Sequence, residues 1–163
     1  HAAMTGHLVL STLHTNDAPT TLPRLMDMGV PPFLIAFTAN IIVAQRLVRK
    51  ICEGCKTPKQ ITDAEFASLA RTLTPKMLNN HRDFFVGKGC KTCSESGYKG
   101  RVGIYEVLEI TDPIRTAIMK RANAGELREL AVKEGMTTML QDGFHKAVSG
   151  VTTIEEILRV IHE

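Results

Sequence analysis

The sequence predicts an α/β fold, in which the edge of an α/β domain is followed by a mostly helical part. The stretch Gly6–Thr15 is rich in β-forming residues and contains no charged residue, which is typical of a central strand buried on both faces of a sheet. Helix-start patterns recur after residue 102, and two Cys-x-x-Cys pairs lie between these regions. The change in character predicts boundaries near residues 51 and 101.

The composition indicates a folded chain. The 163 residues are 44% hydrophobic and 23% charged, which excludes an intrinsically disordered protein. The longest apolar stretch, Phe33–Val43, is interrupted by Thr38 and Asn40 and is too short to span a bilayer. The first residues lack a basic region and an apolar core, so no secretory signal is predicted. Because the chain also begins without Met, we expect a fragment of a longer protein.

Two helices are predicted in residues 1–51. Asn16 or Asp17 can cap the first, Pro19 fits its first turn, and Gly29 ends it. Phe33–Lys50 is predicted as a long second helix, because it becomes basic at its end, as the helix dipole favours.

Later elements follow from local capping patterns and alternation. The capping box formed by Thr62 and Glu65 predicts a helix that runs to about Leu73. Val102–Ile110 alternates between apolar and polar residues, like a strand. Further helices are predicted from Asp112-Pro113, from Asn123 with Glu126 to Gly135, from about Thr138 to Ser149, and from Thr153 with Glu156 to His162.

The four cysteines form two matched pairs, Cys52/Cys55 and Cys90/Cys93. Each Cys-x-x-Cys turn presents two thiolates to one ion, and two turns complete the tetrahedral sulfur site that zinc prefers. Basic residues flank both pairs and would offset the negative charge of the thiolates. We therefore predict a structural Zn²⁺ site, since four thiolates leave no open position for water. The long insert of residues 56–89 must then fold back.

Other interpretations of the cysteines are less favoured. Four unrelated reduced cysteines would not require matched pairs. A thioredoxin-like redox pair is disfavoured, because neither pair lies between a strand and a helix of a βαβ unit. Without a secretory signal, a disulfide framework is also less expected than a metal site.

His14 lies at the carboxyl end of the predicted buried strand. Ligands of open α/β sheets bind at the carboxyl ends of the strands. The imidazole of His14 could therefore contact a phosphate or a water molecule. A hydrogen-bonded core histidine is the alternative that the residues alone leave open.

The stretch Gly6–Ala18 closely resembles the His box of the secretion ATPases, the RecA-like motors of type II secretion and type IV pili. The stretches Arg24–Gly29, Ala44–Arg49 and Gly97–Glu106 also resemble that family, so the resemblance covers essentially the whole chain. The four-cysteine element is similar to that of the assembly motors, whereas retraction motors usually lack it.

The resemblance implies the C-terminal fragment of a motor ATPase that powers type IV pilus assembly or type II secretion. Residues 1–51 would be the C-terminal part of a RecA-like domain, residues 52–101 a zinc-binding element, and residues 102–163 a helical subdomain. The parent would be a homo-oligomer, with a hexamer expected. It would lie in the cytoplasm at the inner face of the bacterial inner membrane and act on an inner-membrane platform protein.

The resemblance also implies roles for individual residues. His14 would be catalytic, near the γ-phosphate of ATP. His7 lies in the same box and Arg46 in the family's Gln-Arg-Leu motif, so both are predicted to contribute to nucleotide binding. The four cysteines match the zinc ligands.

No phosphate-binding loop of the type G-x-x-x-x-G-K-[ST] is present. Lys88 is preceded by Gly87 but followed by Gly89 instead of Ser or Thr. The acidic stretches that hold Mg²⁺ in this family are missing too. We therefore expect ATP hydrolysis to require the parent protein and the isolated chain to be inactive.

Two further function classes are compatible with parts of the sequence. A zinc-stabilised nucleic-acid-binding module would explain the net charge of +3 and the basic cysteine turns. However, only 5% of residues are aromatic and none is Trp, so few side chains could stack on bases, and we expect no nucleic acid partner. A purely structural interaction domain is the other class, supported by the apolar stripe of Ile154, Ile157, Leu158 and Ile161.

Overall fold

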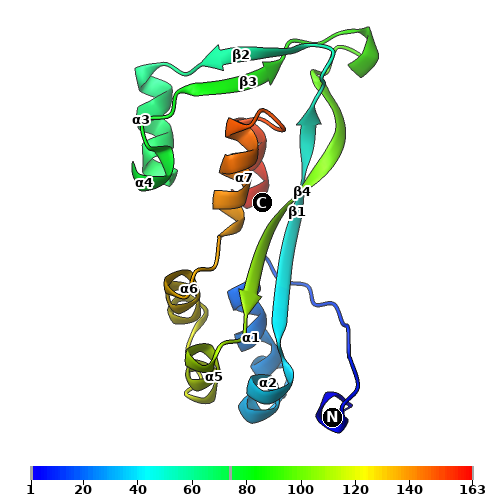
Figure 1. Ribbon diagram of the computed structural model, residues 1–163, viewed down its shortest axis with the longest axis vertical. Helices are drawn as coiled ribbons and strands as arrows, with labels where there is room; N and C mark the ends of the chain where they lie inside the picture. Colours follow the sequence, from blue (N-terminus) through cyan, green and yellow to red (C-terminus); the bar gives the residue numbers. More distant parts are fainter. Residues whose placement is uncertain (1, 74, 163) are drawn as a thin grey trace. The chain divides into compact units, whose positions relative to one another are not determined.

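The computed structural model describes residues 2–73 and 75–162 of the chain. Two compact units are present, and each is built from two separated segments: His1–Gln45 with Tyr105–Met139, and Arg46–Ile104 with Leu140–Glu163. The elements appear in Figure 1 in the order η1 (Ala3–Thr5), α1 (Ala18–Asp27), α2 (Pro32–Thr38), β1 (Ile41–Ile51), β2 (Lys56–Gln60), α3 (Asp63–Thr72), α4 (Pro75–Leu78), β3 (Asp83–Gly87), η2 (Lys91–Cys93), β4 (Tyr98–Glu109), α5 (Asp112–Met119), α6 (Ala124–Lys133), α7 (Met139–Val148) and α8 (Ile154–His162).

Strands β1 and β4 form a two-stranded sheet, and each contributes residues to both units. The N–H of Ile110 donates to Asn40 O and the N–H of Cys52 donates to Gly97 O, so the two strands run in opposite directions. The predicted boundaries at residues 51 and 101 fall at the end of β1 and inside β4. The division into 1–51, 52–101 and 102–163 stays a prediction.

Most of the helices that local patterns predict are present. Asp17 caps α1 by accepting a 2.8 Å hydrogen bond from the N–H of Thr20, and the chain turns away at Gly29 with φ of 86°. Complete capping boxes open α3 and α6. Helices α5, α7 and α8 and strand β4 also lie where the sequence predicts them.

The prediction of a buried strand over Gly6–Thr15 is wrong. Residues 7–15 have no regular secondary structure, and the side chains of Leu8 and Leu10 are each 87% exposed. A strand that is apolar on both faces needs neighbouring strands to satisfy its backbone groups. Among the described residues, none pairs with this segment as a strand. Hydrophobicity alone therefore does not hold it in a sheet.

The prediction of a long helix over Phe33–Lys50 is also wrong. Helix α2 ends at Thr38, and strand β1 begins at Ile41. The start of β1 is β-branched, which favours a strand over a helix. The pairing of β1 with β4, which lies far along the chain at Tyr98–Glu109, supplies backbone hydrogen bonds that a local helix pattern cannot anticipate.

A buried carboxylate organises the first unit. Glu106 on β4 is only 1% exposed, and its two oxygens accept hydrogen bonds from the N–H of Ala18 at 3.0 Å and of Met139 at 3.2 Å. These are the first residues of α1 and α7, where unpaired N–H groups and the helix dipole favour a negative charge. Asp17, next to Ala18, also forms a 2.6 Å ion pair with Arg128 of α6. The start of α1 is thus fixed from two sides.

Replacing Glu106 with Gln is expected to destabilise the protein by about 2 kcal/mol, because an amide N–H₂ would face a backbone donor and the charge would be lost. The measurement is the urea midpoint of unfolding. Glu109→Gln is a matched control, since Glu109 is exposed on the same strand. Equal midpoints for the two variants would contradict the assigned role of Glu106.

In the second unit, β2 and β3 pair antiparallel from Lys56 with Gly87 to Gln60 with Asp83. Helices α3 and α4 lie between these strands in the sequence. This pairing explains how the long insert returns the chain to Cys90. The two strands were not predicted, because each is only five residues long and β2 contains Pro58 and polar residues instead of a clear alternation.

A second buried carboxylate lies on α8. Glu156 is 2% exposed and accepts hydrogen bonds from the N–H of Arg49 at 3.0 Å, from the Arg49 guanidinium at 2.5 Å, and from Arg159 at 3.1 Å. Burial raises the pKa of Glu156, but the hydrogen bonds from Arg49 and Arg159 outweigh this effect and lower the pKa from 4.5 to about 2.

Because the folded-state pKa of Glu156 is depressed, its stabilising contribution is complete above about pH 5 and is lost as the pH falls towards 2. The contribution is on the order of 2 kcal/mol, after allowing for solvent screening of the half-exposed Arg49. Glu156→Gln should therefore lose less stability than the wild type over this range. Unfolding free energies at each pH test this, with Glu155→Gln as the control. Parallel pH curves for wild type and Glu156→Gln would contradict it.

Candidate metal centre

The four cysteines converge in the second unit. Their sulfur atoms all lie within 4.8 Å of one another, although the two pairs are far apart in the sequence. The Sγ atoms of Cys52 and Cys90 are 3.8 Å apart, those of Cys55 and Cys93 are 3.9 Å apart, and those of Cys90 and Cys93 are 3.7 Å apart. All four are free thiols, with Cys52 and Cys93 buried.

These separations fit a metal ion better than any other partner. A tetrahedral ion with sulfur ligands at about 2.3 Å separates those sulfurs by about 3.8 Å. A disulfide would bring two sulfurs to about 2.05 Å. The donor set can therefore hold one metal ion with four sulfur ligands, as the cysteine spacing predicts.

Backbone hydrogen bonds shape both turns. The N–H of Cys55 donates to Cys52 O, and the N–H of Cys93 donates to Cys90 O, each at 3.1 Å. Cys93 Sγ also accepts from the N–H of Cys90 at 3.2 Å and from the N–H of Gly97 at 3.3 Å. Such N–H donors stabilise a thiolate. The Cys93 sulfur and the backbone of both turns are thus held by groups that do not require the metal.

Gly97 is a site residue that sequence reasoning missed. Its N–H donates to Cys93 Sγ, and its carbonyl accepts from the N–H of Cys52, so it joins the two turns. A Cβ atom on Gly97 would lie 2.4 Å from Gly87 O, and one on Gly87 would lie 2.0 Å from Gly97 O. Only glycine fits at this backbone contact. The sequence feature that could have identified Gly97 as part of the site is its position four residues after Cys93.

The thiols differ in acidity. Burial raises the pKa of Cys93, but the backbone N–H groups of Cys90 and Gly97 outweigh this and lower it to about 6. Burial, together with the facing thiols of Cys93, Cys90 and Cys52, raises the pKa of the Cys55 thiol to about 12, although the N–H of Gly89 acts to lower it. Four thiolates cannot all carry charge this close together without a cation, so the cluster favours binding a metal.

The basic residues around the turns fall into two groups. Lys56 lies 4.0 Å from Glu53, and Lys59 pairs with Glu65 at 3.0 Å and Glu155 at 3.3 Å. The other group is exposed and consists of Lys50, Lys88, Lys91, Lys99 and Arg101. A cavity of about 300 Å³ opens beside the first turn, and Lys50, Lys99, Glu53 and Thr92 are among its lining residues. Its two lysines give it a positive net charge.

The predicted nucleotide-binding residues lie elsewhere. His7 and His14 are both exposed in the first unit, and His7 Nδ1 lies 3.0 Å from Thr5 Oγ1. Arg46 is half-buried and belongs to the second unit. The roles of His7, His14 and Arg46 in nucleotide binding stay predictions.

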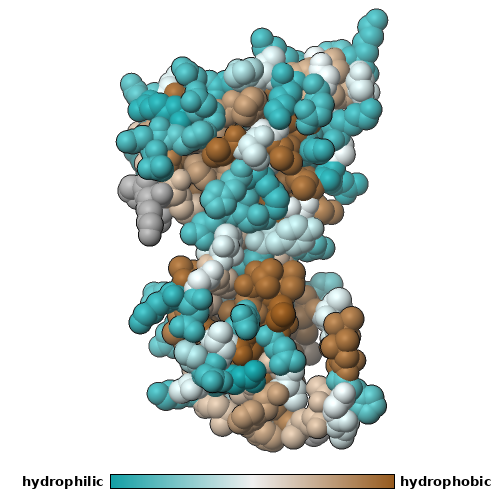
Figure 2. All heavy atoms as spheres, viewed as in Figure 1, coloured by the Kyte–Doolittle hydropathy of each residue, from teal (hydrophilic) through white to brown (hydrophobic). Residues whose placement is uncertain are grey.

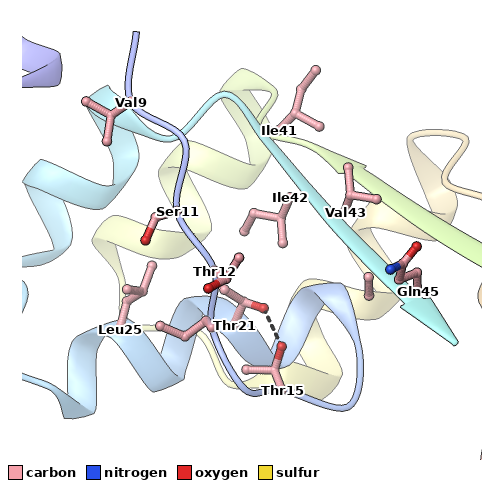
Figure 3. A pocket seen from close by; sticks show the side chains of 12 residues that line it. Val9, Ser11, Thr12, Thr15, Thr21, Leu25, Ile41, Ile42, Val43 and Gln45 are labelled. Carbon is pink, nitrogen blue, oxygen red and sulfur yellow. Dashed lines mark hydrogen bonds between the residues drawn. The ribbon is translucent and has the colours of Figure 1, made fainter. Parts of the chain in front are cut away.

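A larger cavity of about 520 Å³ lies in the first unit (Figure 3). It is lined by residues of the 9–15 segment, by α1 and by the first half of β1. The Thr15 and Thr21 hydroxyls, 2.9 Å apart, hold the segment against α1. His14 is not among the lining residues, although its neighbours Leu13 and Thr15 are.

Apolar side chains are unusually exposed on the first unit, as Figure 2 shows by its brown surface. The exposed side chains include Leu8, Val9, Leu10, Phe37, Ile41, Val43 and Val107. Exposed apolar surface marks contacts with another part of a protein where it gathers into patches. None of the helices in the described part of the chain has the length and apolar character needed to cross a membrane.

The chain is similar to proteins of secretion and pilus machines. The model of the family described as "Type II/IV secretion system protein" matches residues 1–159. The chain is 43% identical over 157 residues to the type IV pilus assembly ATPase PilB of Myxococcus xanthus, covering 96% of this chain and 27% of that protein. It is 39% identical over 163 residues to the type II secretion system protein E of Aeromonas hydrophila, covering 99% of this chain and 31% of that protein.

A further relative agrees with these two. The type IV pilus assembly ATPase PilB of Acinetobacter baylyi is 45% identical over 163 residues, covering 99% of this chain and 28% of that protein. The chain thus spans less than a third of the length of these relatives. Because the family model matches nearly all of its residues, the chain belongs to the type II/IV secretion system protein family.

Proposed function

We propose that this chain is the C-terminal part of a motor ATPase that drives type IV pilus assembly or type II protein secretion. The observation that carries the proposal is the identity of about 43% to a pilus assembly ATPase over 96% of the chain. The similarity to type II secretion system protein E is of the same order, so both machines remain candidates. In either case ATP hydrolysis would be the energy source.

The first unit would complete a RecA-like domain in the parent. The exposed, β-rich 7–15 segment supports this, because further strands from the parent would satisfy its backbone and cover Leu8 and Leu10. His14 would then lie near the γ-phosphate of ATP, with His7 in the same box. Arg46 would contribute to the nucleotide site, and Mg²⁺ would bind with ATP through residues outside this chain.

The metal would be a structural Zn²⁺ held by Cys52, Cys55, Cys90 and Cys93. Sulfur–sulfur distances near 3.8 Å and the donor set of four thiolates support zinc in a closed site. When bound, the ion would supply charge to stabilise the thiolates and would cross-link the turn between β1 and β2 to η2. Elemental analysis of protein purified without added metal should give about one zinc per chain.

The activity proposal is tested by comparing the full-length parent with this chain. The parent should hydrolyse ATP, whereas the isolated 163 residues should not exceed background, because they contain no phosphate-binding loop. Loss of pilus extension or of secretion in a strain lacking the parent would then decide between the two machines. An inactive parent, or a strain in which both outputs are normal, would overturn the proposal.

The parent would work as a homo-oligomer, expected to be a hexamer, at the cytoplasmic face of the inner membrane. The positively charged cavity beside the first cysteine turn would contact an acidic surface of the platform protein. Lys50 and Lys99 are better candidates for this contact than Lys56 and Lys59, because the latter two already form ion pairs within the chain.

Changing Lys50 and Lys99 together to Glu in the full-length protein is expected to abolish pilus or secretion output while ATP hydrolysis and zinc content stay normal. The charge-matched control changes Lys120 and Lys133, which are exposed on the first unit, to Glu. Full output from the Lys50/Lys99 variant would show that these charges only face solvent.

A further inference from the structure

The C-terminal residues 151–156 hold the backbone that leads into the first cysteine turn. The N–H of Ile51 donates to Val151 O at 2.9 Å, and the Thr152 hydroxyl donates to Arg49 O at 2.7 Å. The N–H of Arg49 donates to a carboxylate oxygen of Glu156 at 3.0 Å. The three bonds together fix residues 49–51, which lie directly before Cys52. We call residues 151–156 the C-terminal clamp.

The clamp also reaches the second cysteine turn. Tyr98 is its contact there: the phenol oxygen lies 3.0 Å from Thr153 Oγ1, and the Arg49 guanidinium lies 4.2 Å from the ring centroid. Tyr98 directly follows Gly97, whose backbone binds both Cys52 N–H and Cys93 Sγ. Each of these contacts is formed without any sulfur–metal bond.

Glu156 is the centre of the clamp. It is 2% exposed and binds both the backbone and the guanidinium of Arg49, while its own N–H donates to Thr153 Oγ1 at 3.2 Å. Removing its charge would leave the N–H and the guanidinium of Arg49 without their charged acceptor. The stretch before Cys52 would then keep its bonds to Val151 and Thr152 but lose the charged one, so the Cys52 thiol would be held less firmly.

We propose that Glu156 is a positioning residue for the metal site, and that the C-terminal clamp slows metal release by holding Cys52 in place opposite Cys90. This inference rests on the proposed zinc binding. A metal leaves a four-thiolate site by losing one ligand first, so any group that restrains one ligand's backbone slows the first step. Cys52 is the ligand closest to the clamp.

The test is the rate at which the zinc-loaded 163-residue chain transfers zinc to a chromogenic chelator in excess. Glu156→Gln should release zinc about tenfold faster than the wild type, since charge-assisted hydrogen bonds are lost. Tyr98→Phe keeps the ring beneath Arg49 but loses the bond to Thr153, so release should be about threefold faster. This second variant keeps the proposal testable if Glu156→Gln does not fold.

Two controls separate positioning from general destabilisation. Val160→Ala removes buried volume from α8 outside the clamp, and Glu155→Gln removes a neighbouring carboxylate that pairs with Lys59. Both should release zinc at the wild-type rate, even where Val160→Ala lowers the melting temperature as much as Glu156→Gln does. In the Co²⁺-loaded protein, the thiolate charge-transfer bands should shift for Glu156→Gln and not for Val160→Ala.

The outcomes distinguish the two proposals. A wild-type chain that binds no zinc would refute the proposed metal site itself. Zinc bound in all variants, with release from Glu156→Gln no faster than from Val160→Ala at an equal melting temperature, would overturn the clamp alone.

Discussion

Changing Cys93 to Ser is expected to eliminate zinc from the protein and to unfold the cysteine turns together with the β2–β3 pair. Cys93 Sγ is the best-connected sulfur, since it accepts two backbone N–H groups and faces the thiols of Cys90 and Cys55. Structural zinc contributes about 10–16 kcal/mol in zinc-finger peptides, and a whole domain is stable by only about 5–15 kcal/mol. Few other single changes in this chain should have so large an effect.

Zinc content and the melting temperature, measured on the same preparation, test this expectation. Ser94→Gly is the matched control, because Ser94 is exposed and has φ of 52°, a conformation that glycine adopts easily. The control should keep one zinc and an unchanged or higher melting temperature. A Cys93→Ser protein that retains one equivalent of zinc and melts normally would show that three thiolates suffice.

His14→Ala in the full-length parent is expected to lower the rate of ATP hydrolysis by about 100-fold, the scale at which a positioned acid, base or charge donor acts. In the isolated 163-residue chain the same substitution should leave the melting temperature unchanged, because the His14 side chain is exposed there and makes no hydrogen bond or ion pair with any other described residue. Turnover number and thermal unfolding should be measured together.

His81→Ala is the control for His14→Ala, because the opposite effects on stability and on hydrolysis are expected. The ring of His81 binds Asp83 O at 2.6 Å and packs edge-on against Phe84, in the second unit. Its loss should lower stability and leave hydrolysis unchanged. If His14→Ala also leaves the rate of ATP hydrolysis unchanged, His14 has no catalytic role.

Elements whose causes are local could be predicted from the sequence. Asp17 and the capping boxes of α3 and α6 act within three residues, so the pattern and the contact coincide. The cysteine spacing likewise predicted that the four thiols come together, because a Cys-x-x-Cys turn fixes the geometry of its own two ligands.

Elements whose causes lie far along the chain could not be predicted. The strand assigned to Gly6–Thr15 and the helix assigned to Phe33–Lys50 failed because a strand depends on its partners and not only on its own residues. Glu156 binds Arg49 across more than a hundred positions, and no local pattern indicates that pair. The burial of Glu106 is indicated by one sequence pattern that the prediction did not use: Glu106 alternates with Ile104 and Leu108, which are also buried on β4.

The discontinuous make-up of the two units has a consequence during synthesis on the ribosome. Neither unit has all of its residues until the chain has been translated well beyond residue 105, since the first needs Tyr105–Met139 and the second needs Leu140–Glu163. All four cysteines emerge before the clamp residues do. The nascent thiols can therefore bind a metal ion before α8 has been made. A ribosome that stalls after Cys93 would leave cysteine turns that can hold the ion but lack the clamp. The clamp residues, which are translated after all four cysteines, would be those that turn a metal-bound intermediate into a clamped one.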